Sequence, residues 1–457
     1  MFIPIARFLA LITIAILTSS SALAEGHPLA SIQKGFKGLS HYIFDKSTAE
    51  HLNPQRPTRS NIAAIQKSTT LKNININTTS VEGCLPTLPH GNQSVIKQFG
   101  RAARVMANNS SESVKSLSAQ PYFSGLKGQK LTIMRKDLER ALVHQSGSAS
   151  EIFHNTTITP ATRAACDTSG RSTWDIELKH HIDAHESDHR PLIRSDIVIN
   201  NRLHLGGYFL GTASMRYNLY DNLNKEPTLR TLPHPNPLRR DVLGFAWQGL
   251  NMERLMVSGF ATPTSDLYLA GHAGYLEEMF FGLGGEFLYR PYDSAFSIGG
   301  ELWSTVKRAP YLGGITTLDN NNRQTSALLN LWYDVPFQPY SLGLSAGQFM
   351  DNDMGGQLRA RYTPKPGWNI EGYGTYSNKE NQSLDQSTNT NTEVGLRLSM
   401  PLGALKILPT NSRQTFEIKP FARDKGQRLD NPYPLYDLTN PWQARSIYRY
   451  WNEITEQ

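Results

Sequence analysis

The second half of the chain, from residue 174 to residue 421, consists of segments of about ten residues in which apolar and polar side chains alternate. Clusters of Asn, Asp, Gly and Pro separate these segments. Alternation with period two is typical of a β-strand that has one apolar and one polar face. In residues 393–400 the apolar face carries Val394, Leu396 and Leu398. Strands of this kind in series predict a mainly β, antiparallel structure.

The length of these segments favours a transmembrane barrel. Ten residues that rise about 3.3 Å each, tilted by about 40–45°, climb about 25 Å, the height of the apolar band of an outer-membrane barrel. A slip by one residue would turn Glu393 and Arg397 toward lipid, where an arginine at the midplane costs about 2–4 kcal/mol. Tyr289, Trp368 and Tyr376 lie near strand ends, where interfacial aromatic girdles are expected. We predict an antiparallel transmembrane β-barrel over residues 173–422.

The strand count and the lumen follow from the same pattern. We count about twelve strands, and we choose twelve because bacterial single-chain barrels have even numbers. Residues 174–182, where His180 interrupts the apolar face, and residues 243–261 fit the pattern least well. A barrel of this size has a narrow lumen. The inward side chains that we expect to line it are Glu286, Glu301, Arg359, Arg361, Glu371 and Arg397.

Two interpretations of these inward charges stay open at this point. They could line a passage for a hydroxyl-rich polymer, or they could pair with one another and fill the lumen. A soluble β-sandwich or propeller also alternates, although its strands are usually nearer five or six residues long. A soluble periplasmic carbohydrate-binding β protein is therefore kept as a further alternative.

The first residues have the pattern of a Sec-type signal peptide over residues 1–24. Arg7 provides the positive region, residues 8–17 the apolar core, and residues 22–24 the small-residue cleavage site. The mature chain is expected to begin at Glu25 and to be exported. Since no cysteine lies near that cut, we do not expect a lipid-anchored start.

Between the signal peptide and the barrel we predict a linker at residues 25–80 and a small α/β periplasmic domain at residues 81–172. Residues 94–106 and 137–144 have helical patterns, and residues 131–134 resemble a strand. The chain has two cysteines, Cys84 and Cys166, and in an oxidising compartment we expect a disulfide between them. Such a bond would stabilise the fold by about 3–5 kcal/mol. The alternative is two buried, unpaired cysteines.

Composition and charge exclude several classes of protein. After the signal peptide no run of 18 apolar residues occurs, so a bundle of transmembrane helices is excluded. The net charge of +7 is modest and spread along the chain. Together with export, this argues against a nucleic-acid partner. An acidic polymer or the phosphates of lipopolysaccharide stay possible partners, but charge alone does not select them.

Possible reactive groups do not assemble into a recognisable site. His181, His185 and His189 are spaced by four, but they straddle a strand and a turn and so do not align as metal ligands. The glycines at 282–285 lack the Lys-Ser/Thr and the helix of a phosphate loop. Glu277 and Glu278 are adjacent and would point to opposite faces of a strand, which argues against glycosidase chemistry. We predict no catalytic residue, cofactor or metal.

Two blocks of sequence resemble a known family, the YjbH/GfcD exopolysaccharide family. The first spans residues 274–291, and its motif residues are Tyr275, Glu277, Glu278, Gly284, Gly285, Glu286, Tyr289, Arg290 and Pro291. The second follows the last predicted strand and carries Arg423, Asp424, Gly426, Gln427, Leu435 and Tyr436. The similarity covers about residues 126–451.

The resemblance implies an outer-membrane β-barrel that is encoded with exopolysaccharide or capsule secretion machinery. It implies a non-enzymatic role in the export or assembly of an extracellular polysaccharide. Its partners would be outer-membrane lipid and lipopolysaccharide, the polymer chain and other secretion components. The runner-up is a non-conducting barrel that anchors the periplasmic domain near those components.

The sequence departs from the family pattern in three ways. It lacks the lipobox cysteine of some members, it has no counterpart of the long N-terminal half, and residues 451–457 do not end on an aromatic side chain. We expect the barrel-assembly signal to be internal, at residues 415–421. Residues 423–457 are expected to be a tail packed on the barrel rim, where Arg423 and Asp424 form hydrogen bonds.

Overall fold

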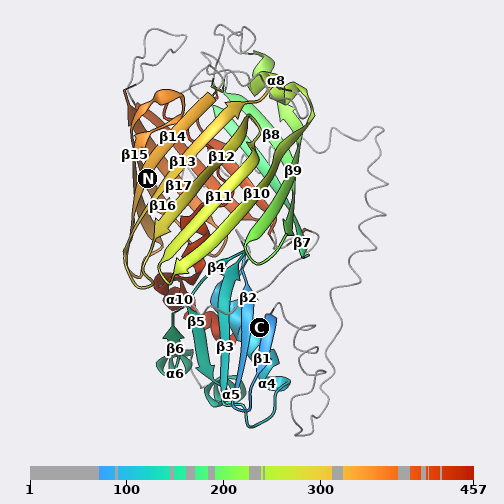
Figure 1. Ribbon diagram of the computed structural model, residues 1–457, viewed down its shortest axis with the longest axis vertical. Helices are drawn as coiled ribbons and strands as arrows, with labels where there is room; N and C mark the ends of the chain where they lie inside the picture. Colours follow the sequence, from blue (N-terminus) through green and yellow to red (C-terminus); the bar gives the residue numbers. More distant parts are fainter. Residues whose placement is uncertain are drawn as a thin grey trace, which may run out of the picture. The chain divides into compact units, whose positions relative to one another are not determined.

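The alternating segments form the strands of a closed β-barrel in the computed structural model of the protein (Figure 1). The structure describes residues 71–87, 91–144, 149–160, 170–183, 191–225, 238–239, 242–310, 323–378, 392–402, 408–409, 411–421 and 425–456. These residues belong to one compact unit, residues 54–457. The expected signal peptide, most of the expected linker, Cys166, His185, His189, Arg423 and Asp424 lie outside the described residues.

Thirteen strands of the described chain close the barrel. Their bounds are β7 (Ser172–Asp183), β8 (Leu192–His204), β9 (Phe209–Asp221), β10 (Leu250–Thr264), β11 (Leu267–Glu277), β12 (Phe280–Tyr289), β13 (Phe296–Lys307), β14 (Arg323–Asp334), β15 (Tyr340–Gln348), β16 (Met354–Tyr362), β17 (Asn369–Ser377), β18 (Thr392–Pro401) and β19 (Arg413–Ile418). Each strand pairs antiparallel with its neighbours along the chain, and the barrel closes through β19 and β7.

The prediction of twelve strands is wrong by one, and the closing pair gives the reason. An even count follows only if every pair around the ring is antiparallel, whereas β19 and β7 run parallel, with Arg413 opposite Glu177 and Ile418 opposite Ile182. One parallel pair permits an odd number of strands. The short η3 (Leu223–Lys225) and α8 (Val242–Trp247) lie between β9 and β10, so the predicted strand at 243–261 begins as a helix.

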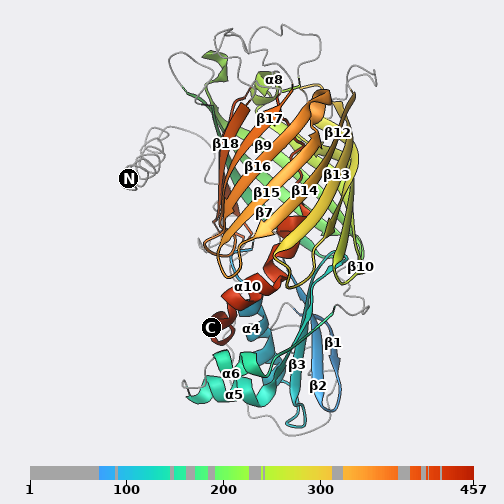
Figure 2. The ribbon, with the colours of Figure 1, turned by 90° about the vertical axis from the view of Figure 1, so that its left-hand side faces the viewer.

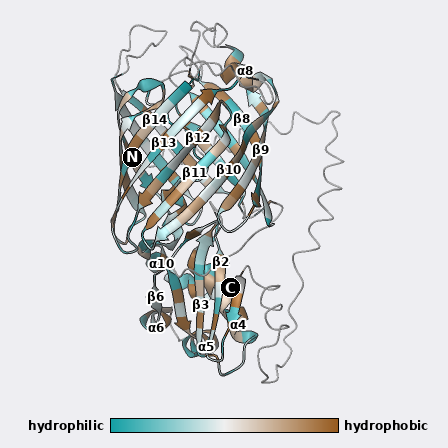
Figure 3. Ribbon diagram, viewed as in Figure 1, coloured by the Kyte–Doolittle hydropathy of each residue, from teal (hydrophilic) through white to brown (hydrophobic). Residues whose placement is uncertain are grey.

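The two faces of the wall differ as the alternation predicts. Figure 3 shows hydrophobic and hydrophilic residues alternating along the strands of the barrel. Leu302 on β13 and Val394 on β18 have 65% and 71% of their surface exposed on the outer face. Their neighbours Glu301 and Glu393 point into the lumen. Trp303, an apolar residue on the polar side of β13, also faces inward and covers Gly284 on the adjacent strand.

A small α/β region precedes the barrel, as predicted. Its mixed sheet has the order β1-β2-β3-β5-β6, and β4 pairs with β3. The strands are β1 (Lys72–Ile76), β2 (Ser80–Pro86), β3 (Ser116–Phe123), β4 (Leu126–Lys127), β5 (Lys130–Met134) and β6 (Thr157–Thr159). The helices α4 (Val95–Asn108), α5 (Arg135–His144) and α6 (Ala149–His154) pack beside the sheet (Figure 2). The first strand begins at Lys72, inside the stretch expected to be a linker.

Local sequence explains the helix that forms the core of this region. Ser94 caps α4, because its side chain accepts a hydrogen bond from the amide of Lys97 at 3.0 Å. Phe99, Ala103 and Met106 recur at helical spacing and are fully buried. None of the described helices has both the length and the apolar character needed to cross a bilayer.

Cys84 lies on β2 of the small region, where it is buried and disulfide-bonded. This excludes the alternative of an unpaired thiol at this position. The pairing with Cys166 stays a prediction.

The C-terminal residues form α9 (Leu435–Thr439), η6 (Asn440–Trp442), α10 (Ala444–Arg449) and η7 (Trp451–Thr455). The structure does not place all of this tail on the rim. Most of residues 425–437, which we call the lumen segment, line the cavity inside the barrel, and the later residues contact the rim and the small region. The physical reason is that inward charges of the wall offer partners to the polar groups of this segment.

Candidate functional site in the barrel lumen

The lumen contains a cavity of about 350 Å³ between the wall and the lumen segment. Of the described residues that line it, twelve are Asp or Glu and eleven are Lys or Arg. All six residues predicted to line the lumen are among them. Because the two signs are almost balanced, the lumen offers no strong net charge to a ligand, and most of its charged groups are close enough to form ion pairs.

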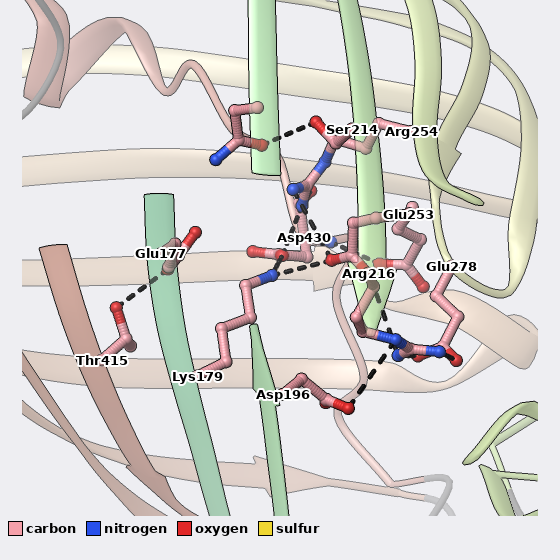
Figure 4. Close-up of polar contacts among 12 residues, drawn as sticks. Glu177, Lys179, Asp196, Ser214, Arg216, Glu253, Arg254, Glu278, Thr415 and Asp430 are labelled. Atoms are coloured by element: carbon pink, nitrogen blue, oxygen red, sulfur yellow. Dashed lines mark hydrogen bonds and ion pairs between the residues drawn. The ribbon is translucent and has the colours of Figure 1, made fainter. Parts of the chain in front are cut away.

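Asp430 of the lumen segment is bound by cations from three strands. Its carboxylate lies 2.5 Å from a guanidinium nitrogen of Arg254 on β10, 3.7 Å from Lys179 on β7 and 3.5 Å from Arg397 on β18. The backbone amide of Asp430 donates to Glu277 at 2.8 Å. Figure 4 shows Lys179 reaching both Asp430 and Glu253, to which it lies at 2.7 Å.

These contacts make Asp430 the electrostatic anchor of the lumen segment. The side chain of Asp430 is only partly exposed, and cations close to it stabilise its negative charge through charge-assisted hydrogen bonds and ion pairs. Here three cations from separate strands lie within 4 Å of it. Asp430 therefore acts as a fixed negative charge that holds the lumen segment against the wall.

Further contacts hold the segment on both sides of Asp430. Arg428 donates to Glu301 at 2.6 Å and to Gln357 at 3.1 Å. The amide of Leu435 donates to Glu286 at 2.9 Å. The predicted lumen residues Glu286 and Glu301 thus line the cavity and also bond to the chain's own C-terminal residues.

Tyr433 and Tyr436 are the aromatic anchors of the segment. The hydroxyl of Tyr433 is 3.0 Å from Arg202 and 2.8 Å from Thr212. The ring of Tyr436 stacks on Trp332 with a centroid distance of 4.1 Å and an angle of 12°. Both rings are buried, so they hold the segment by packing as well as by hydrogen bonds.

Arg290 joins Tyr436 to the wall. Its guanidinium donates to the carbonyl of Tyr436 at 2.9 Å and pairs with Asp334 at 2.6 Å. The hydroxyl of Tyr436 also bonds to Asp334. Arg290, Asp334 and Tyr436 therefore form a network at the end of the lumen segment, to which Arg445 adds an ion pair with Asp334 at 3.0 Å.

Of the remaining predicted lumen residues, Arg361, Glu371 and Arg397 form ion pairs, whereas Arg359 forms hydrogen bonds. Arg361 contacts Glu371 at 2.6 Å and also bonds to Asp437 of the segment. Arg359 donates to Ser345 at 2.8 Å. Arg397 lies 3.7 Å from Glu417 in addition to its contact with Asp430. The structure therefore favours the interpretation in which paired charges fill the lumen.

The motif residues of the first sequence block lie on β11, on β12 and in the turns that follow them. Glu277 pairs with Arg239 at 2.8 Å, and Glu278 pairs with Arg194 at 3.0 Å. The expectation that these two carboxylates point to opposite faces is wrong, since both line the cavity. The physical reason is an irregularity in the register between Tyr275 and Glu277, which breaks the alternation at the strand end.

The other motif residues serve the packing of the hairpin. Gly284 and Gly285 let the strands approach closely, because a Cβ at Gly284 would lie 2.3 Å from the ring of Trp303. Tyr289 is 48% exposed at the end of β12. Pro291 begins the turn after β12 and accepts a hydrogen bond from the amide of Ser294.

In the second block, Gly426 and Gln427 contact the turn after β15. The amide of Gly426 donates to Asp353 at 2.7 Å, and the carbonyl of Gln427 accepts from Met350 at 3.1 Å. Gly426 has a φ of +59°, and a Cβ there would lie 2.4 Å from Thr375, so glycine is required. The next motif residue along the chain, Leu435, is fully buried.

Sequence reasoning missed the cluster around Arg194, Arg216 and Glu253. The adjacent residues Glu253 and Arg254 both point inward because the register of β10 shifts between Met252 and Arg254. This bulge and the helix α8 at the start of the stretch are the reasons why residues 243–261 fitted the alternation poorly. The only signal in the sequence is the charged pair Glu253-Arg254, which would have to be interpreted as a bulge.

Among the described residues, no group of potential metal ligands includes a histidine with the spacing of four noted in the sequence. The ring of His181 bonds to the carbonyl of Lys419 at 3.1 Å and packs on Phe421 at a centroid distance of 3.8 Å. It therefore fixes the chain just after β19. His185 and His189 are not among the described residues.

Comparison with known proteins identifies the family. The family model for the exopolysaccharide biosynthesis protein YbjH, named YjbH, matches residues 44–441. The uncharacterized lipoprotein YjbH of Escherichia coli K12 is 29% identical over 245 residues. That match covers 52% of this chain and 34% of the relative, so it spans about a third of the relative's length. On the family match over most of its length, the chain belongs to the YjbH exopolysaccharide biosynthesis family.

Proposed function

We propose that this protein is an outer-membrane β-barrel that assists the export or assembly of an extracellular polysaccharide, without enzymatic activity of its own. Its partners are outer-membrane lipid and lipopolysaccharide, the polymer and other secretion components. The family match supports the link to exopolysaccharide. The observation that carries the membrane part is the apolar outer face of the closed barrel.

The outer face consists of large aliphatic side chains in the middle of the strands. Each of the following is about half exposed or more: Leu255, Val257, Leu283, Leu302, Leu329, Leu344, Leu358 and Val394. A continuous apolar surface of this extent would be unfavourable in water, because monomeric soluble proteins rarely expose large apolar patches. Lipid removes this cost.

Aromatic side chains mark both ends of the apolar belt. At the end next to the small region lie Trp174, Tyr208, Phe209, Tyr289, Phe296 and Tyr340, and at the other end lie Tyr217, Tyr220, Trp247 and Tyr376. Amphipathic rings prefer the boundary between lipid and water. Contacts at the first end, such as Ser124 to His204 at 2.8 Å, hold the small region there, and we propose that this is the periplasmic side.

The filled lumen favours a second candidate for the detailed role. With the lumen segment seated, a cavity of about 350 Å³ is left among the described residues of the lumen, and a barrel occupied in this way would anchor the small region at the membrane near other secretion components. A channel role would require the segment to leave. Both the channel role and the anchoring role are compatible with the proposal of an outer-membrane barrel. Measurements on lumen variants, described below, separate the two roles.

The membrane proposal is tested by cell fractionation and a heat-modifiability gel. The protein is expected in the outer-membrane fraction, to need detergent for extraction, and to migrate faster when it is not boiled. A soluble periplasmic carbohydrate-binding protein would be extracted without detergent and would show no shift on heating. That result would overturn the proposal.

Conductance in planar bilayers and polymer export by lumen variants together separate channel from anchor. We expect the wild-type protein to show no steady conductance. Single substitutions of lumen charges, such as Glu371→Gln, that alter polymer export would support passage through the lumen. Unchanged export with every such variant would favour the anchoring role.

A further inference from the structure

The C-terminal chain crosses the barrel from one end to the other. Since β19 runs parallel to β7, both strands end at the rim far from the small region. Just beyond, the amide of Phe421 donates to Asp183 at the end of β7 at 2.8 Å. The amide of Gly426 then donates to Asp353 in the turn between β15 and β16, at the same far rim. The lumen segment therefore starts at the far rim and leads back inward.

The chain leaves the lumen at the rim next to the small region. The amide of Ala444 donates to Tyr292 in the turn between β12 and β13 at 3.1 Å. Arg449 donates to the carbonyls of Thr363 and Pro364, in the turn between β16 and β17, at 2.9 Å and 2.7 Å. These turns lie at the end that carries the small region, since β13 and β17 start there.

The last residues complete the core of the small region. Trp451 and Ile454 of η7 are buried in the same hydrophobic cluster as Phe99 of α4. Arg104 donates to the carbonyl of Ile454 at 3.1 Å. At Gly100 a Cβ would lie 2.1 Å from the carbonyl oxygen of Ile454, so η7 sits directly on the backbone of α4.

We infer that residues 425–455 couple the small region to the state of the lumen. One continuous segment is held at Asp430 by wall cations and at η7 by α4, and short helices without a long linker join the two sites. If the chain is released from one of these two sites, it is less restrained at the other. The contacts at Asp430 and the contacts of η7 with α4 therefore stabilise each other. A partner that displaces η7 from α4 would thereby loosen the lumen segment. What this coupling means for polysaccharide export rests on the proposed function. The coupling between the two sites does not depend on that function.

Gly100 provides a precise test at one end. The substitution Gly100→Ala favours the helix α4 intrinsically, since alanine is the better helix former, but places a methyl group where η7 must sit. The lumen is probed through Ser345→Cys, a fully buried position that Arg428 covers at 3.1 Å. In purified protein we expect Gly100→Ala to raise the rate of labelling of this introduced thiol by a water-soluble maleimide about fivefold or more. The control Arg101→Ala, an exposed neighbour on α4, should label at the background rate.

The reverse effect must also occur, because coupling between two sites is reciprocal. Asp430→Asn removes the negative charge that pairs with Arg254, Lys179 and Arg397, and so weakens the attachment of the lumen segment to the wall. We expect it to speed trimming of residues 451–456 by a carboxypeptidase by about the same factor, measured by mass spectrometry. Glu112→Gln removes one exposed acidic charge from the small region and should leave trimming unchanged.

The outcomes decide between coupling and independence. A chain ending at Tyr450 removes η7 without touching α4, and it replaces Gly100→Ala if that variant does not fold. If the tail is released while labelling of the thiol introduced at position 345 stays at the background rate, the coupling is wrong. Neither readout depends on a membrane or on conductance, so failure of the outer-membrane proposal in the fractionation experiment is a distinct result.

Discussion

The outer and inner faces of the barrel wall are built from the same strands but follow opposite rules. Leu302 on β13 is 65% exposed, whereas Arg290, in the turn after β12, is only 1% exposed. The outer face holds apolar groups without specific partners, and the inner face holds charged groups whose partners are fixed. This arrangement inverts the usual order of a water-soluble protein.

The contrast between the two faces indicates which positions of the sequence are constrained. The outer face needs only apolar side chains, so exchanges among Leu, Val and Ile should be tolerated. The inner face needs particular pairs at particular positions, because removing one member of a buried ion pair leaves the other charge uncompensated. Substitutions on the two faces test this contrast, with expected effects that fall from about 3–5 kcal/mol to almost nothing.

The largest effect is expected at Arg290. Its guanidinium binds Asp334, Thr439 and the carbonyl of Tyr436, and it is almost fully buried. Arg290→Met should destabilise the protein by about 3–5 kcal/mol, because the Asp334 carboxylate loses its nearest buried cation. The midpoint of urea unfolding in lipid vesicles measures this. Arg323→Met, at an exposed end of β14, should change stability by less than about 0.5 kcal/mol. Equal effects of the two variants would contradict the contrast between the faces.

The outer face is tested at Leu302. If the outer face lies in lipid, as we propose, an arginine there would sit in the apolar layer at mid-strand, and Leu302→Arg should cost about 2–4 kcal/mol in a bilayer. In a water-exposed wall the same change would cost almost nothing. Unfolding in vesicles is compared for Leu302→Arg and the apolar control Leu302→Met. If the arginine variant is as stable as the methionine variant, the outer face does not lie in lipid.

Two glycines compare the faces on a smaller scale. A Cβ at the inward Gly284 would lie 2.3 Å from the ring of Trp303 and 2.5 Å from the carbonyl of Leu302, whereas at the outward Gly372 it meets nothing within 4 Å. Gly284→Ala should therefore destabilise by about 1–3 kcal/mol. Gly372→Ala should be neutral or stabilising by up to about 1 kcal/mol. The thermal unfolding midpoint of Gly284→Ala is expected to be lower than that of Gly372→Ala. The reverse order would refute the packing argument.

Much of the fold was predictable because its causes are local. Alternation in residues 393–400 determines which side of β18 faces outward, and the capping serine and apolar spacing determine α4. The closed barrel and the small α/β region follow from such patterns, and so does the placement of Arg361 and Glu371 in the lumen. These inferences need only the residues within one strand or one helix.

The rest was not predictable because its causes are long-range or break the period. The bulge before Arg254 turns two adjacent charged residues inward. The parallel closing pair depends on where β19 meets β7, which lies at the other end of the barrel sequence. The lumen segment has no regular period, and its position depends on partners such as Glu301 and Lys179 on distant strands. Local pattern alone therefore predicts a tail on the rim.

The smallest effect is expected when one methylene is added to a valine of the outer face. Val394 on β18 is 71% exposed, and the fluid lipid that we propose around it would have no fixed shape for the added group to meet, so Val394→Ile should change stability by less than about 0.5 kcal/mol. The matched change on the inner face is Val198→Ile on β8, where the side chain is fully buried and the same group must displace packed neighbours at a cost of about 1–3 kcal/mol. Urea midpoints of the two variants in vesicles are compared with that of the wild-type protein. If Val394→Ile costs as much as Val198→Ile, the outer position packs against a surface of fixed shape, such as another protein subunit, and the outer face would then need particular partners just as the inner face does.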